Sequence, residues 1–136
     1  LNKDDTIKKY GQKQVKIWRR SFDISPPQME EQHPYKNKIK SNILSESLKD
    51  TFNRVMPYFN KKIKPLILSN KNVLIVFHGN SCRALLKEIL NLSEKKIIEF
   101  EVPTGNPLLI RFEKNFKVKD CKYLDKKRAK KILFNI

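Results

Sequence analysis

The sequence predicts an α/β fold in which helices flank a partial sheet, and three observations support this class. Residues 73–77 form an apolar run rich in β-branched types, and a helical pattern follows directly over 81–90. Two more apolar runs surround the turn sequence PTGN. With 136 residues and 39% hydrophobic content, the chain is long enough for one modest core and too apolar for a disordered segment.

The first part of the chain predicts two short helices and a loop. The stretch DDTIKKYG predicts a helix that ends at Gly11 and is capped by Asp4, Asp5 or Thr6. The stretch KQVKIWRRSF predicts a second helix with an apolar stripe of Val15, Trp18 and Phe22. Residues 23–42 contain three prolines and predict a long irregular loop, and loops of this length are often functional.

A long helix is predicted from SESLKD to the end of LILSN, because apolar residues recur there at helical spacing. Ser45 is the expected N-cap. The acidic residues that favour the positive end of the helix follow it at Glu46 and Asp50. Proline is costly inside a helix, so kinks or an early end are expected at Pro57 and Pro65.

The second half predicts strands around one helix. Val73 to Phe77 is expected to be a strand buried on both faces, as in a parallel sheet. The helix after it has four residues expected to face inward, Leu85, Leu86, Ile89 and Leu90. Strands are also predicted over 96–103, over 107–113 and, at the sheet edge, over 116–124. Residues 125–136 form a basic tail, for which a terminal helix is one interpretation.

The net charge of +16 is typical of proteins with anionic partners, such as nucleic acid, a membrane surface or small phosphates. Only six of the 30 basic residues are arginines, the type that base and phosphate readers prefer. The lysines are scattered, so a solvated basic surface is expected and nucleic-acid binding is not. The sequence has neither an apolar run long enough to cross a membrane nor a secretory signal, so no membrane partner is expected.

Cys82 and Cys121 show neither a CxxC spacing nor a framework of bridges, which favours a reducing, cytoplasmic compartment. Both are expected to be small core residues. Two distant histidines without a cysteine pair do not make a zinc pattern, so no metal is expected.

The segment FHGNS is the main candidate for chemistry. His78 follows the predicted strand, at the edge where open α/β sheets bind ligands. Gly79 allows a sharp turn and close approach of a ligand, and Asn80 and Ser81 stand at a helix start whose free N–H groups favour an anion. A histidine that titrates near neutrality can donate a hydrogen bond to that anion. The segment predicts a phosphate or carboxylate site, and a structural histidine at a strand–helix junction is the alternative.

Arg19 and Arg20 are the second candidate. Neighbours on a helix point about 100° apart, so the two side chains share a target only if the helix ends there. The following SFD and two prolines predict that end. Both guanidinium groups could then reach one dianion, and a solvated basic corner is the alternative.

Six segments occur together in one order: LNK, KYGQKQVKIWRRSFD, PPQ with HPY, ESLKDTFNRVMPY, VLIVFHGNSCRALLK and VPTGNPL. As a set, over about Leu1 to Leu124, they closely resemble the cofactor-dependent phosphoglycerate mutases of the histidine phosphatase superfamily. The resemblance implies a glycolytic and gluconeogenic isomerase that interconverts 2-phosphoglycerate and 3-phosphoglycerate through a phosphohistidine. It also implies 2,3-bisphosphoglycerate as primer, a small phosphorylated three-carbon acid as substrate, and a homo-oligomer for the full-length enzyme.

By this resemblance, His78 is the second active-site histidine, which stabilises the transferring phosphoryl group and is not the nucleophile. Gly79 and Asn80 contact the phosphate beside it. The substrate's carboxylate and distal phosphate are held by Lys3, Arg19 and Arg20. Phosphoryl transfer depends on such positioning and charge neutralisation, for which bidentate guanidinium contacts are suited.

The departures from the family pattern are also informative. The nucleophile motif RHGES and the proton-donor motif ERHYG do not occur in the sequence. Residues 1–136 are therefore expected to be the C-terminal portion of a single mutase-like domain, inactive alone, with apolar surface exposed where the missing N-terminal half belongs. The loop over 33–44 is shorter than in relatives. Phe77 replaces a small residue, and its ring is expected either to crowd the nucleophile's place or to pack into the core.

Three other functions are considered. The main alternative is an inactive relic or an anion-binding interaction domain of the same fold. A phosphatase of the same superfamily is disfavoured by WRRSFD together with ESLKDT. Nucleic-acid binding through the basic surface lacks a reading motif.

Overall fold

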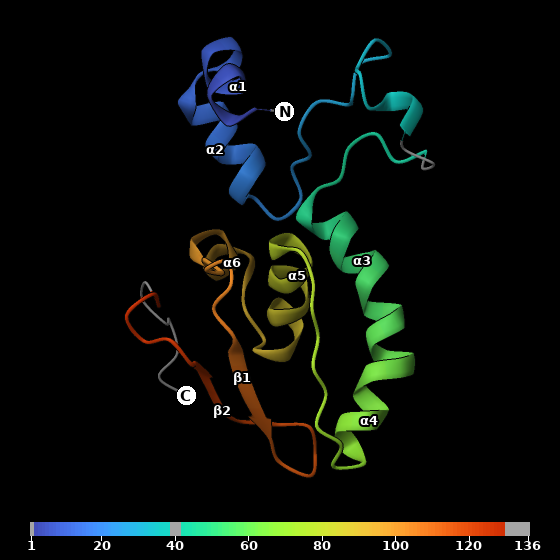
Figure 1. The fold of residues 1–136 in the computed structure, drawn as a ribbon, viewed down its shortest axis with the longest axis vertical. Helices are drawn as coiled ribbons and strands as arrows, with labels where there is room; N and C mark the ends of the chain where they lie inside the picture. Colours follow the sequence, from blue (N-terminus) through green and yellow to red (C-terminus); the bar gives the residue numbers. More distant parts are fainter. Residues whose placement is uncertain (1, 39–41, 130–136) are drawn as a thin grey trace.

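The computed structural model describes residues 2–38 and 42–129, in which eight helical segments of various types precede one small hairpin. In chain order the elements are α1 (Lys3–Tyr10), α2 (Gln12–Arg20), η1 (Lys36–Lys38), α3 (Leu48–Tyr58), η2 (Phe59–Ile63), α4 (Lys64–Leu68), α5 (Gly79–Ile89), α6 (Glu94–Glu99), β1 (Leu108–Phe112) and β2 (Val118–Tyr123). Figure 1 shows α5 between the α3–α4 column and the hairpin, with α1 and α2 at one end of the molecule.

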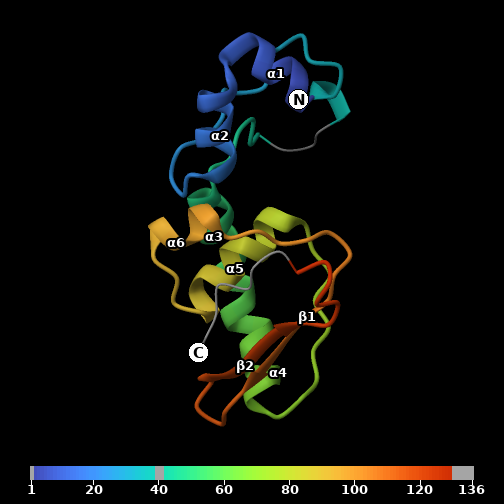
Figure 2. The ribbon, with the colours of Figure 1, turned by 90° about the vertical axis from the view of Figure 1, so that its left-hand side faces the viewer.

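The two N-terminal helices confirm the sequence prediction, although the predicted cap was wrong. Asn2 is the N-cap of α1, because its side chain accepts a hydrogen bond from the backbone N–H of Asp4 at 2.9 Å. Gly11 ends α1 with a φ of 80°, a conformation that favours glycine. Figure 2 shows α1 and α2 at one end of the molecule, on the far side of α3 and α5 from the hairpin, and an ion pair between Lys9 and Glu30 joins α1 to the loop after α2.

The long helix predicted after Ser45 begins at α3, and Ser47 rather than Ser45 is its N-cap. The Ser47 hydroxyl accepts from the backbone N–H of Asp50 at 3.1 Å, and the Asp50 carboxylate accepts from the N–H of Ser47 at 2.9 Å. This reciprocal pair is a capping box. The Ser45 hydroxyl instead donates to the carbonyl of Pro26 at 2.5 Å.

The two prolines of this helix do mark an interruption. Pro57 lies inside α3, and the π-helical segment η2 follows directly. Pro65 lies in the first turn of α4, where its missing N–H costs least. A π-helical segment at this place agrees with the expected kink or early end.

The predicted buried strand at 73–77 is wrong for the described residues. These residues belong to no strand, and none of their backbone groups takes part in a hydrogen bond described in the structure. The side chains of Leu74 and Val76 are 89% and 88% exposed, whereas Ile75 packs against the core cluster around Met56, Phe59 and Leu85. The side chains of this segment therefore alternate between an inner and an outer face, as in a β-strand. Among the described residues, however, no strand lies beside the segment to pair with it.

The strand predicted over 96–103 is also wrong, because its first part is the helix α6. Ser93 caps this helix by accepting from the backbone N–H of Lys96 at 3.2 Å, and Glu94 lies in its first turn. The other two predicted strands are confirmed as β1 and β2, which pair antiparallel. Among residues 2–38 and 42–129 this hairpin is the whole sheet, so the structure is a mixture of helices and strands without a parallel pair.

The core lies between α5, α3 and α6. Its main cluster joins buried residues from the loop after α2, from α3, from α5 and from α6, namely Phe22, Leu48, Cys82, Ala84, Leu86, Leu92, Ile97 and Phe100. Cys82 and Cys121 are both buried and free, which confirms the expected core role. No helix in the described part is long and apolar enough to span a membrane. The basic tail forms a turn up to residue 129, and the rest of it lies outside the described residues.

Candidate functional site

The end of α2 places the two neighbouring arginines. The helix stops at Arg20 because Ser21 adopts an extended conformation, with φ −60° and ψ 159°. The backbone N–H and the hydroxyl of Ser21 both donate to the carbonyl of Ile17, at 2.8 and 2.7 Å. Phe22 then enters the core, and its carbonyl accepts from the N–H of Lys49 at 2.7 Å. The predicted helix end after Arg19 and Arg20 is therefore confirmed.

The beginning of α5 places the histidine. His78 is the N-cap residue of α5, and its Nδ1 accepts from the backbone N–H of Asn80 at 3.4 Å. A neutral imidazole that accepts at Nδ1 carries its proton on Nε2, so Nε2–H is the donor left for a ligand. The helix is held in place by the buried residues Cys82, Leu85 and Leu86 on its inner face.

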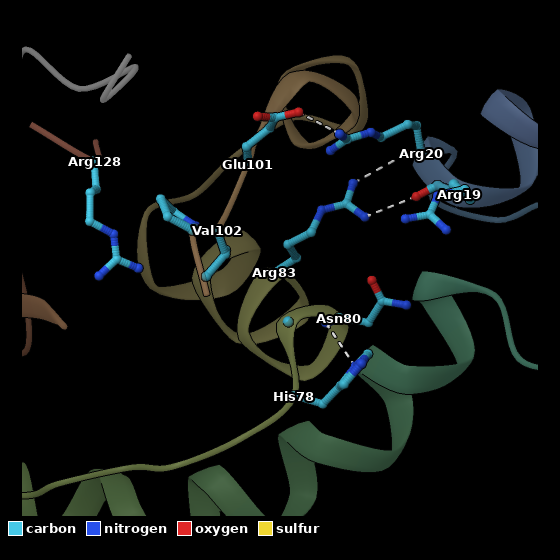
Figure 3. Close-up of a pocket in the computed structure, with 10 residues that line it drawn as sticks. Arg19, Arg20, His78, Asn80, Arg83, Glu101, Val102 and Arg128 are labelled. Atoms are coloured by element: carbon cyan, nitrogen blue, oxygen red, sulfur yellow. Dashed lines mark hydrogen bonds and ion pairs between the residues drawn. The ribbon is translucent and has the colours of Figure 1, made fainter. Parts of the chain in front are cut away.

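These two helix ends line one open pocket with a volume of about 460 Å³. From α2 it includes Arg19 and Arg20, and from the start of α5 it includes His78, Gly79 and Asn80. Figure 3 shows the side chains of Arg19 and Arg20 on one side and those of His78 and Asn80 on the other. The pocket thus brings together five of the six residues predicted for the site. Its walls offer two guanidinium groups, one imidazole and the positive end of a helix dipole, which together favour an anion.

Glu101, from the segment after α6, adds a negative charge to the same pocket. Its carboxylate forms an ion pair with the guanidinium of Arg20 at 2.5 Å, and the side chains are 51% and 33% exposed respectively. The pairing occupies Arg20 in this conformation of the chain. An anionic ligand that binds Arg20 must therefore compete with Glu101.

Arg128, from the basic tail, contributes a further guanidinium to the pocket wall. It donates to the carbonyls of Thr104 and Gly105 and forms an ion pair with Asp125 at 3.9 Å. These contacts fix the turn that follows Pro103, which also lines the pocket. The PTGN turn and the start of the tail therefore form one side of the pocket.

Arg83 lies at the base of the pocket and is only 5% exposed. Its guanidinium donates to the backbone carbonyls of Arg19 at 3.4 Å, Arg20 at 3.3 Å and Ile97 at 2.6 Å. Burial and then the nearby charge of Arg20 lower the pKa of Arg83 to about 10, which leaves it charged at neutral pH. Figure 3 shows its head group reaching from α5 to the end of α2.

The geometry changes two expectations about individual residues and leaves a third as a prediction. Lys3 is the first residue of α1 and is not among the pocket residues, so its role as a substrate ligand stays a prediction. Gly79 has helical backbone without a positive φ, so the expected sharp turn at this position is wrong, and a Cβ there would meet no atom within 4 Å. Phe77 is 39% exposed and is not part of either core cluster, so the expectation that it packs into the core is wrong.

Sequence reasoning missed five of the pocket residues, namely Arg83, Glu101, Val102, Pro103 and Arg128. Arg83 had a detectable signal, because a charged residue stands inside the apolar helix segment CRALL. An arginine on the inward face of a helix needs partners, and carbonyls at nearby helix ends are suitable acceptors. Glu101 and Arg128 had no such signal, since they reach the pocket only through long-range packing. Among the described residues no cluster of side chains suited to a metal ion is found.

Comparison with known proteins identifies the family to which these features belong. The histidine phosphatase superfamily (branch 1) matches residues 1–121. The chain is 53% identical to a 2,3-bisphosphoglycerate-dependent phosphoglycerate mutase of Treponema denticola, in a match that covers 91% of this chain and 54% of that protein. A protein of the same name from Buchnera aphidicola subsp. Acyrthosiphon pisum is 47% identical, over 83% of this chain and 53% of that protein.

The match includes every residue predicted for the site, from Lys3 to Asn80. The chain spans about half the length of the curated relatives it matches. The extent of the family match and the level of identity show that this chain belongs to the histidine phosphatase superfamily, branch 1.

Proposed function

We propose that this chain carries the substrate-binding half of a 2,3-bisphosphoglycerate-dependent phosphoglycerate mutase site. The observation that carries the proposal is the single pocket in which Arg19 and Arg20 face the start of α5 at His78. The names of relatives that are 53% and 47% identical support the same activity. The substrate is a three-carbon acid with one phosphate, which has an anionic group at each end.

The pocket residues fit such a substrate. Arg19 and Arg20 bind the carboxylate and the distal phosphate, for which a guanidinium offers two parallel N–H donors. At the other side, His78 donates from Nε2 to the transferring phosphoryl group, and Gly79 and Asn80 approach it at the helix N-terminus. These donors neutralise charge on the equatorial oxygens in the transition state, where the largest electrostatic gain is expected.

The proposed phosphoryl carrier is a histidine that does not belong to these 136 residues. Their two histidines are His78 and His33. His33 lines a different pocket, together with α1 and Met29, so it does not face His78. 2,3-Bisphosphoglycerate supplies the phosphoryl group that primes such enzymes. The proposed role of His78 is to stabilise that group during its transfer, while a second imidazole accepts it.

The segment 73–77 is the proposed contact with the part that provides this imidazole. Its inner face already packs on the core through Ile75, whereas its outer face exposes Leu74 and Val76 and its backbone hydrogen-bonding groups lack partners in the described structure. Burial of one such aliphatic side chain contributes about 1.5–3 kcal/mol. Adjacent strands from the remaining half of the relatives' length would satisfy both the apolar face and the backbone.

The inactive relic or anion-binding domain of the same fold is the second candidate. Phe77 supports it, because its partly exposed ring stands next to His78 in the sequence. In this case the pocket binds anions while no phosphoryl group is transferred.

One complementation experiment separates the two candidates. The chain is mixed with the part of the Treponema denticola mutase that it does not match, and conversion of 3-phosphoglycerate is measured with 2,3-bisphosphoglycerate present. The mutase proposal predicts no activity from the chain alone, activity from the mixture, loss of it with His78→Ala, and retention with His33→Ala. Anion binding by an inactive mixture favours the relic, and phosphohistidine formed on the chain alone contradicts the role given to His78.

A further inference from the structure

Arg83 is a buried cation for which residues 2–38 and 42–129 provide no carboxylate in contact. It lies in α5 between Cys82 and Ala84, five residues after His78, and is 5% exposed. Its Nε–H group is buried without a hydrogen-bond partner in the described structure. Burying a charge without an opposite charge is costly, so the side chain must be held by strong acceptors.

The acceptors are carbonyls at the ends of two other helices. Arg19 and Arg20 are the last residues of α2, and Ile97 lies in the last turn of α6. The last four carbonyls of a helix lack partners within that helix and carry the negative end of its dipole. One guanidinium therefore caps α2 and α6 at the same time, with bonds of 3.4, 3.3 and 2.6 Å.

This arrangement ties the two sides of the pocket to each other. The same backbone units that Arg83 holds carry the side chains of Arg19 and Arg20. Arg83 itself belongs to the helix that begins at His78. A displacement of the α2 end relative to α5 would change the distance between the arginines and the imidazole, and Arg83 opposes that displacement directly.

We propose that Arg83 is a positioning residue that fixes Arg19 and Arg20 opposite His78, without touching the substrate itself. The inference rests on the proposed function of the pocket as a site for a phosphorylated acid. It adds a residue that binds the protein backbone and acts on the ligand only through the two arginines. A lysine cannot take its place fully, because one ammonium group cannot reach three carbonyls from the directions that the guanidinium uses.

The test compares three variants of the 136-residue chain. Arg83→Met removes the cap, and Arg83→Lys keeps the charge but not the fork. Leu85→Ala is the matched control, because Leu85 is equally buried on α5 but faces Met56 and Phe59 on the other side. The affinities for 3-phosphoglycerate and inorganic phosphate are measured by calorimetry well below each unfolding midpoint. Hydrogen exchange at the Ser21 amide, which donates to the carbonyl of Ile17, reports on the end of α2.

Arg83→Met is expected to weaken the affinity for 3-phosphoglycerate by about tenfold and to speed exchange at Ser21. Arg83→Lys should show a smaller loss of both. Leu85→Ala should lower the unfolding midpoint but leave the affinity within about twofold of the wild type.

Wild-type affinity and wild-type exchange in both Arg83 variants would overturn the inference, as would an equal loss of affinity in Leu85→Ala. If Arg83→Met does not fold, Arg83→Lys decides by the same two measurements. If the wild-type chain binds neither anion, the proposed function fails, and exchange at Ser21 still decides whether Arg83 fixes the end of α2.

Discussion

The guanidinium of Arg20 and the carboxylate of Glu101 form an ion pair of 2.5 Å inside the pocket that His78 also lines. The two residues are far apart in the sequence and meet because the segment after α6 passes the end of α2. A negative group thus lies at the place where a negative ligand is proposed to bind. Removing the charge of Glu101 therefore tests whether the ligand and this carboxylate compete for Arg20.

Glu101→Gln is expected to strengthen binding of 3-phosphoglycerate by up to about fivefold, because a partly exposed ion pair is worth about 1 kcal/mol or less. Glu99→Gln makes the same change in net charge at an exposed position of α6 outside the pocket and should have little effect. Calorimetry at low ionic strength measures both. An unchanged or weaker affinity in Glu101→Gln would show that the ligand does not compete for Arg20.

The capping box of α3 predicts a stability difference that depends on pH. Hydrogen bonds from the hydroxyl and then the backbone N–H of Ser47 lower the pKa of Asp50. A carboxyl group whose pKa is lower in the folded state stabilises the fold above its unfolded pKa of about 4, and this contribution is lost as the pH falls through the folded pKa. Asp50→Asn should therefore lower the melting temperature at pH 7 and have a progressively smaller effect below about pH 4.

The control for this prediction is Asp23→Asn, which removes the same charge from an exposed loop position. Melting curves of the three proteins across the acid range give the comparison. A constant difference between wild type and Asp50→Asn at all pH values would contradict the assigned role of the carboxylate.

The two cysteines are expected to be unreactive while the chain is folded. Burial raises the pKa of the Cys82 thiol to about 12 and that of Cys121 to about 11. Only the thiolate attacks a disulfide reagent, and the ordinary pKa of a free cysteine is about 8.5. Labelling by an aromatic disulfide at pH 8 should be slow in native buffer and fast in guanidinium chloride. Immediate labelling of both thiols in native buffer would show that this core does not form.

The exposed side chains of segment 73–77 predict association of the isolated chain. Replacing both Leu74 and Val76 by lysine should reduce its concentration-dependent association, since these two side chains are 89% and 88% exposed. Leu66→Lys, on α4 and 47% exposed, is the control and should have a smaller effect. Sedimentation over a range of concentrations measures this. A wild-type chain that stays monomeric, or equal effects of both changes, would contradict the proposed contact.

The elements that could be predicted from the sequence are those fixed by local interactions. Gly11 ends α1, α2 ends at Arg20 before Ser21, and the turn between Pro103 and Pro107 precedes the hairpin. The strand at 73–77 was wrong because a strand requires a neighbour, which the described residues do not provide. The predicted strand over 96–103 was wrong because Ser93 caps a helix there, and this local cap outweighs the strand preference of the β-branched residues Ile97 and Ile98.

The residues of the candidate site also fall into those that local sequence patterns predict and those that they do not. His78 and the two arginines of α2 were found because each stands at a predicted element end with a chemical reason to be there. Arg83 stands out locally as a charge inside the apolar segment CRALL, but its acceptor on Arg20 lies 63 positions away, and Glu101 meets Arg20 across 81 positions. No local pattern reports these contacts.

Titration of the two histidines with phosphate tests the central claim most directly. The side-chain resonances of His78 and His33 are the only imidazole signals, and His33 lies at a different pocket, which makes it an internal control. Nitrogen-15 spectra are recorded as 3-phosphoglycerate is added at neutral pH. The account predicts a saturable shift of the His78 Nε2 resonance, weaker in Arg20→Met, with His33 unchanged. A His78 signal that does not respond while the anion binds would contradict it.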